Sequence, residues 1–164
     1  MMNPQTLFLT FLGTGKLPSM RVAFATLLAI AVGAAIVVSL GMETLFMLMF
    51  AVSVISLFEI NKYLAKHPES DGSEITVDDA TGAWMSLMVA LSTAQHYEIS
   101  YIQPIAMALA FASFMLFQTW KPSTIGWMAR KLKGGWGIVL SSLLSGMAGG
   151  LLSALIIMGM GRLF

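Results

Sequence analysis

The chain has 164 residues, of which 57% are hydrophobic and only 10% are charged, and its net charge at pH 7 is +1. A water-soluble domain carries roughly a quarter charged residues, so this composition excludes a soluble globule and indicates an integral membrane protein. A net charge near zero argues against a nucleic-acid-binding protein, which would present a basic face. The absence of cysteine excludes disulfides, thiolate nucleophiles and cysteine-based metal sites.

Five apolar runs approach the length of about 20 residues that a helix needs to cross a bilayer. They predict membrane spans at 22–40, 44–60, 80–95, 101–120 and 137–160. The apolar run before them is too short to span and is interrupted by Gly13 and Gly15, so residues 7–15 are predicted to form a re-entrant or interfacial helix. The sequence therefore predicts a single all-α membrane domain over residues 1–164.

The distribution of Lys and Arg predicts the orientation, because positively charged residues stay on the cytoplasmic side. With five spans, the N-terminal arm and the long polar loops at 61–79 and 121–136 fall on one side, together with eight of the nine basic residues. Only Arg162 lies opposite. We therefore expect a multi-pass protein with its N-terminus inside and its C-terminus outside.

The loop before the 80–95 span is rich in carboxylates. Asp78 or Asp79 would cap a helix that we expect to begin near Ala80, satisfying free backbone N–H groups. Capping needs only one aspartate, however, and two adjacent carboxylates with Asp71 seven residues earlier would supply oxygen ligands for Mg²⁺. Gly82 would permit the close approach of a lipid headgroup or of a neighbouring helix.

Basic residues lie in the other long loop. Trp120-Lys121-Pro122 ends the 101–120 span, since proline stops a helix, and Lys121 either snorkels to the interface or binds phosphate. The Arg-Lys-Leu-Lys-Gly-Gly stretch at 130–135 either anchors on anionic lipid or holds an anionic headgroup at the N-terminus of the last helix. Together, acids that could hold a hard cation and basic groups that could hold phosphate indicate a phosphoryl-transfer site.

Three further features carry no chemistry in this interpretation. The Gly-Thr-Gly-Lys sequence at 13–16 is not a nucleotide-binding loop, because its spacing is wrong and Leu17 follows the lysine. His67 is expected to be a solvated loop residue. Small residues recur every four positions in the last span and predict a helix-packing face: Ser142, Gly146, Gly150 and Ala154.

Four segments in this order resemble phosphatidylglycerophosphatase A, a family of small multi-span bacterial enzymes that remove phosphate from phosphatidylglycerophosphate: residues 11–18, 73–84, 120–122 and 133–138. The resemblance implies a bacterial inner-membrane location, a Mg²⁺ cofactor, a site on the cytoplasmic side and an anionic phospholipid headgroup as substrate. It implies metal ligation by Asp71, Asp78 and Asp79, catalytic roles for Asp71, Asp78 and Lys121, and headgroup binding by Lys16, Lys133, Gly82, Gly134 and Gly135.

The chain departs from the family pattern where the family carries charged groups. Met115 and Gln118 replace an Arg and an Asp, Ala129 replaces an Asp, and Ser141-Ser142 replaces an Asp-Asp pair. Charged groups inside membrane proteins are costly and are usually kept for function, so their loss favours stability over activity. We expect phosphatidylglycerophosphatase activity that is weak or absent. The alternative is a non-catalytic scaffold or lipid-binding protein, either a natural pseudoenzyme or a redesigned sequence, that retains only the fold.

Overall fold

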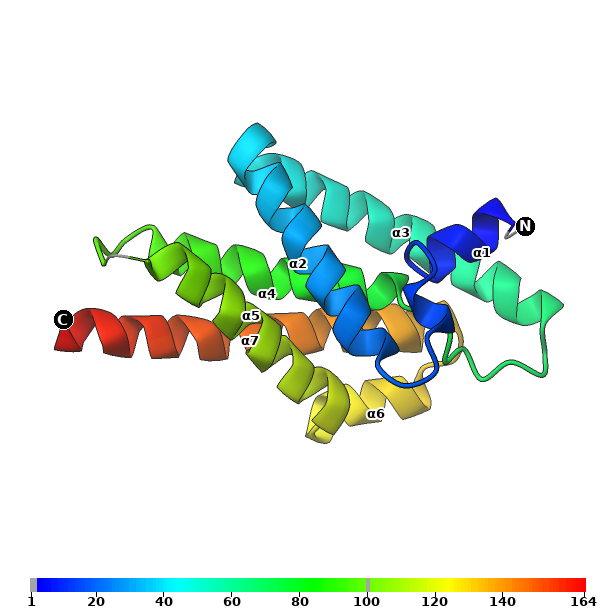
Figure 1. Cartoon of the computed structure of the whole chain (residues 1–164). Helices are drawn as coiled ribbons and strands as arrows, with labels where there is room; N and C mark the ends of the chain where they lie inside the picture. The colour runs from blue at the N-terminus through cyan, green and yellow to red at the C-terminus, as the bar shows by residue number, and fades with distance from the viewer. Residues whose placement is uncertain (1–2, 100) are drawn as a thin grey trace.

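The computed structural model describes residues 3–99 and 101–164, and this part of the chain is all-helical (Figure 1). The predicted all-α class is therefore confirmed. The elements follow in the order α1 (Pro4–Leu9), a 3₁₀ helix η1 (Thr14–Lys16), α2 (Arg21–Leu40), α3 (Met42–Lys66), α4 (Val77–Ala94), α5 (Ile102–Trp120), α6 (Ser123–Lys131) and α7 (Gly135–Leu163).

Four of these helices are long and apolar enough to cross a membrane: α2, α3, α5 and α7. They correspond to the predicted spans at 22–40, 44–60, 101–120 and 137–160. α3 extends beyond its predicted end to Lys66, and α7 extends to Leu163. The apolar runs thus locate the helices well, whereas helix ends depend on contacts that hydropathy does not report.

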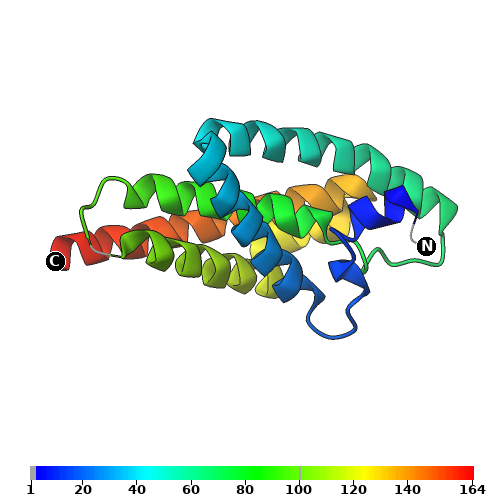
Figure 2. The same ribbon diagram turned by 45° about the horizontal axis from the view of Figure 1, so that its top comes forward.

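The predicted span at 80–95 corresponds to α4, which is not among the four helices that qualify by length and composition. α4 lies alongside α7 in both views (Figures 1 and 2), and 14 of its 18 residues are buried. Because its neighbours shield it from lipid, α4 accommodates polar side chains that a lipid-facing helix would not.

The expected start of this helix near Ala80 is wrong, because α4 begins three residues earlier at Val77. Val77 is buried in a small apolar cluster with Ile60 of α3 and Val139 of α7, which favours the extra helical turn. Asp78 and Asp79 consequently lie inside the first turn, and neither is the N-cap residue, which is Thr76.

α4 and α7 meet backbone to backbone. A Cβ atom on Gly146 of α7 would overlap the backbone of Gly82 of α4, and a Cβ atom on Gly150 would meet Val89 at 2.7 Å. Small residues allow such close approach between membrane helices. The predicted packing face of α7 is therefore confirmed at Gly146 and Gly150, and Gly82 serves a neighbouring helix.

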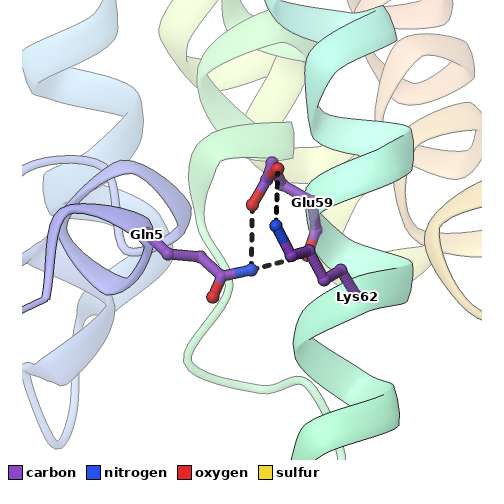
Figure 3. Close-up of polar contacts among 3 residues, drawn as sticks. All are labelled: Gln5, Glu59 and Lys62. Carbon is purple, nitrogen blue, oxygen red and sulfur yellow. Dashed lines mark hydrogen bonds and ion pairs between the residues drawn. The ribbon is translucent and has the colours of Figure 1, made fainter.

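The N-terminal segment predicted as a re-entrant or interfacial helix over 7–15 forms two short helices, α1 and η1, which are separated by a turn with positive φ at Phe11, Leu12 and Gly13. α1 is fastened to α3 by Gln5, whose Nε2 donates to Glu59 Oε2 at 2.8 Å (Figure 3). The backbone N–H of Thr76 donates to the carbonyl of Leu9 at 2.9 Å. The segment is therefore docked on both α3 and the loop before α4.

The region predicted as a polar loop over 121–136 contains the nine-residue helix α6. Ile125 and Gly126 on this helix are buried, whereas Trp127 is exposed. A single buried turn of this kind is too short to give an apolar run in the sequence, so the hydropathy pattern missed it.

Candidate functional site

A cavity of about 330 Å³ lies where α2, α4 and α7 begin and α5 ends. Three carboxylates and a lysine that the sequence singled out line this one cavity: Asp71, Asp78, Asp79 and Lys121. Arg21, the first residue of α2, adds a second cation. The cavity therefore combines acidic and basic side chains that are far apart in the sequence.

Helix ends place these side chains. Asp78 and Asp79 occupy the first turn of α4 and are 4% and 2% exposed, so two adjacent carboxylates are almost entirely removed from solvent. Lys121 follows the last residue of α5 with a φ of +46°, in the left-handed region that favours glycine. A lysine in this conformation carries backbone strain that glycine would not.

The buried carboxylates are held by a hydrogen-bond network that joins three helices. Gln118 of α5 donates its Nε2 to Asp79 Oδ1 at 2.7 Å and to Ser142 Oγ at 2.8 Å. Ser142 of α7 in turn donates a hydrogen bond to Asp78 Oδ2. Within the described residues, Asp78 Oδ1 and Gln118 Oε1 have no hydrogen-bond partner. Unpaired buried oxygens are rare and costly, and both residues line the cavity.

Asp71 reaches the same cavity from the loop between α3 and α4. Hydrogen bonds from Ser73 lower the pKa of Asp71, and the backbone N–H of Ser73 lies 2.9 Å from Asp71 Oδ1. The Asp71 carboxylate is therefore ionised at neutral pH and adds negative charge to the cavity from outside the helical bundle.

The residues predicted to bind the headgroup lie elsewhere. Lys16 lines a different pocket, against α1 and α3, and Lys133 is not among the residues that line the cavity in the described part of the chain. Gly134 and Gly135 pack on α3, where the Gly135 N–H donates to Asn61 Oδ1 at 2.8 Å. Gly82 contacts α7. In this structure the three glycines serve helix packing, and headgroup binding by all five residues stays a prediction.

A sequence model of one family, described as phosphatidylglycerophosphatase A, matches residues 7–157. The chain belongs to the phosphatidylglycerophosphatase A family. The matched range contains every residue that lines the cavity. Comparison with curated proteins and with solved structures gives no match. The resemblance inferred from four short segments is thus confirmed at the level of the family.

Phosphatidylglycerophosphatase A proteins are in general Mg²⁺-dependent, and the donor set of this cavity fits such an ion. Mg²⁺ is usually held by one or two carboxylates together with water and substrate phosphate. Asp78 and Asp79 supply two carboxylates, and Asp78 Oδ1 is unpaired among the described residues. In that same part of the chain, no three acidic or histidine side chains are close enough to form a metal-binding group. Ligation by Asp71 as a third carboxylate stays a prediction.

The sequence interpretation missed two functional candidates, Arg21 and Gln118. It treated Gln118, Ala129 and Ser141 only as departures from the phosphatidylglycerophosphatase A pattern, yet all three line the cavity. The sequence carried no signal for this grouping, because positions 21, 118, 129 and 141 come together only in the folded chain. Three neutral side chains therefore line the cavity together with its acids and cations.

Proposed function

We propose that this cavity binds the terminal phosphate of phosphatidylglycerophosphate and that the chain hydrolyses this phosphomonoester weakly, with Mg²⁺. The observation that carries the proposal is the convergence of Asp78, Asp79 and Lys121 on one cavity within a phosphatidylglycerophosphatase A chain. Its volume of about 330 Å³ admits a headgroup but not the acyl chains, which would remain in the surrounding lipid.

Each group has a role that follows from its charge and position. Lys121 and Arg21 neutralise the substrate phosphate, and Asp78 and Asp79 would hold Mg²⁺, which would supply charge withdrawal from the phosphate oxygens. Water forms a new bond to phosphorus while the bond to the glycerol oxygen breaks, giving inorganic phosphate and an alcohol that takes up the proton. Asp71 contributes a further ionised carboxylate at the cavity.

Weak turnover is expected because two neutral residues, Gln118 and Ser142, are hydrogen-bonded to the buried aspartates. The oxygens Asp79 Oδ1 and Asp78 Oδ2 already accept hydrogen bonds from Gln118 and Ser142, so they are less available to a cation. The same network supports the second candidate, a lipid-binding protein that recognises the headgroup without hydrolysing it.

The test is phosphate release from phosphatidylglycerophosphate in detergent micelles with Mg²⁺. We expect release above a protein-free blank, and a loss of about 100-fold in Lys121→Gly, the magnitude typical for removing one transition-state charge stabiliser. Glycine relieves the strain at φ +46°, which offsets part of the stability lost with the lysine charge, and thermal unfolding of the variant separates lost chemistry from unfolding. Absence of release from the wild type removes the enzymatic proposal, and retained substrate binding would then support the lipid-binding candidate.

We also propose that the cavity faces the cytoplasm, with the N-terminus inside and the C-terminus outside. The N-terminal segment, the end of α3, the start of α4 and α6 gather at one end of the bundle, opposite the C-terminus (Figure 1). Because the chain has no cysteine, single cysteines introduced at the two ends and labelled with an impermeant thiol reagent test this orientation directly.

A further inference from the structure

A second polar pocket, of about 660 Å³, lies between the N-terminal segment and the C-terminal end of α3. Its lining includes Lys16, Lys66 and His67 but no carboxylate among the described residues, and it shares no residue with the cavity described above. We propose that this pocket is a separate binding site for a phosphate group that carries negative charge, as in the headgroup of an anionic phospholipid. The proposal does not depend on hydrolysis in the other cavity.

The two lysines are available to an external anion. Within the described residues, the only ion pair joins Lys62 to Glu59, at 3.9 Å, and leaves Lys16 and Lys66 without an acidic partner. Glu59 is further occupied by Gln5 (Figure 3). The positive charge on the pocket is thus not neutralised by the nearest acid on α3.

Two further acids, Glu69 and Glu74, lie near Tyr63 of this pocket. Neither forms an ion pair with Lys16 or Lys66 in the described part of the chain, and Glu74 is also occupied. Burial raises the pKa of Glu74, but hydrogen bonds from Tyr63 at 2.7 Å and Ser70 at 2.8 Å outweigh it and leave the pKa below its usual value. Glu74 therefore stays ionised and accepts hydrogen bonds from the hydroxyl groups of Tyr63 and Ser70. A bound phosphate would not have to displace it from either lysine.

The walls of the pocket are fixed before any ligand binds. Gln5 on α1 donates to both the side chain and the backbone carbonyl of Glu59 on α3, which holds the two helices together (Figure 3). The ring of His67, predicted to be a solvated loop residue, is instead half-buried and stacked on Tyr63 with ring centroids 4.4 Å apart. A preorganised site loses less conformational entropy on binding.

Apolar side chains beside the pocket indicate that it lies at a membrane surface. Leu12, Leu17 and Met20 flank Lys16 in the sequence and are 65%, 38% and 59% exposed. An interfacial segment typically inserts such side chains below the headgroups while its basic residues remain among them. Lys16 is therefore placed to meet a lipid phosphate, although free phosphate carries the same recognised group.

The test uses the purified full-length chain in neutral detergent, with three separate probes: phosphatidylglycerol, phosphatidylcholine and inorganic phosphate. Bound ligand is counted by native mass spectrometry across a titration. We expect phosphatidylglycerol to bind more tightly than phosphatidylcholine, and its affinity to fall about fivefold for Lys16→Gln or Lys66→Gln and about 30-fold for both. Saturable binding of inorganic phosphate with the same dependence on both lysines would support the site and identify free phosphate as its source.

The matched control removes one positive charge at the other end of the bundle, in Arg162→Gln, because Arg162 lies in the last turn of α7 and does not line this pocket. We expect this variant to bind phosphatidylglycerol like the wild type, and the double Arg variant Lys16→Arg/Lys66→Arg to retain binding. Thermal unfolding without lipid checks that each variant is folded. The proposal is overturned if Arg162→Gln weakens binding as much as Lys16→Gln, or if the folded Lys16→Gln/Lys66→Gln variant binds all three probes like the wild type.

Discussion

The contact between α4 and α7 predicts that a single added methyl group at Gly146 destabilises the protein. A Cβ atom there would lie 2.8 Å from the carbonyl carbon of Gly82, so the obstacle is backbone that cannot rotate away. Overpacking of this kind typically costs about 1–3 kcal/mol, whereas replacing a helical glycine by alanine gains about 1 kcal/mol of helix propensity. We therefore expect Gly146→Ala to lose up to about 2 kcal/mol.

Gly159 provides an internal control, because it lies in the same helix and a Cβ atom there would meet nothing within 4 Å. Gly159→Ala gains the same propensity without the clash, so the two variants should differ by about 2 kcal/mol, or roughly 4–8 °C in Tm for a chain of this size. Thermal unfolding followed by circular dichroism in one detergent measures both. Equal Tm values for the two variants would refute the inferred backbone contact.

Three further outcomes follow from buried or partly buried hydrogen bonds. Trp84→Phe removes the bond from Trp84 Nε1 to the carbonyl of Ala29, at 2.7 Å, and should cost about 1 kcal/mol in thermal unfolding; an unchanged Tm would contradict it. Gln118→Leu leaves Asp79 Oδ1 unpaired and should cost about 1–3 kcal/mol, whereas an equal Tm would show that the network adds no stability. The pKa of Glu74 is lowered in the folded state. The ionised Glu74 side chain therefore contributes fully to the free energy of unfolding above about pH 4.3, and this contribution is lost as pH falls through the lowered pKa. The Tm difference between wild type and Glu74→Gln should therefore shrink below about pH 4, and a constant difference from pH 7 to pH 3 would exclude this linkage.

The sequence predicted the elements whose signal is local. Long apolar runs located α2, α3, α5 and α7, because a lipid-facing helix must be apolar over its whole length. α4 was found but its start was misplaced, since Val77 joins the helix through burial against Ile60 and Val139, residues far away in the chain. α6 was missed because only Ile125 and Gly126 of this helix are buried, which is too few residues to give an apolar run.

The site was predictable only in part. Asp78 and Lys121 could be chosen because their residue types suit phosphoryl transfer, and the structure brings both to one cavity. Lys16 could not be assigned to the correct pocket, because a glycine-rich turn does not reveal in which direction the following side chain points. The bridging role of Gln118 depends on a contact between α4, α5 and α7 that has no counterpart in the linear sequence.

The docking of α1 and η1 has a consequence for the order in which the protein assembles. Gln5 is 54 residues from its partner Glu59, and Thr14 is 62 residues from Thr76, whose hydroxyl lies 3.1 Å away. Ribosomes add about 5–20 residues per second, so α1 and η1 wait roughly 3–12 s for the residues that receive them. The α1–η1 segment thus reaches its final place only after the chain through Thr76 has been made, and until then its leucines can be buried only at the bilayer surface.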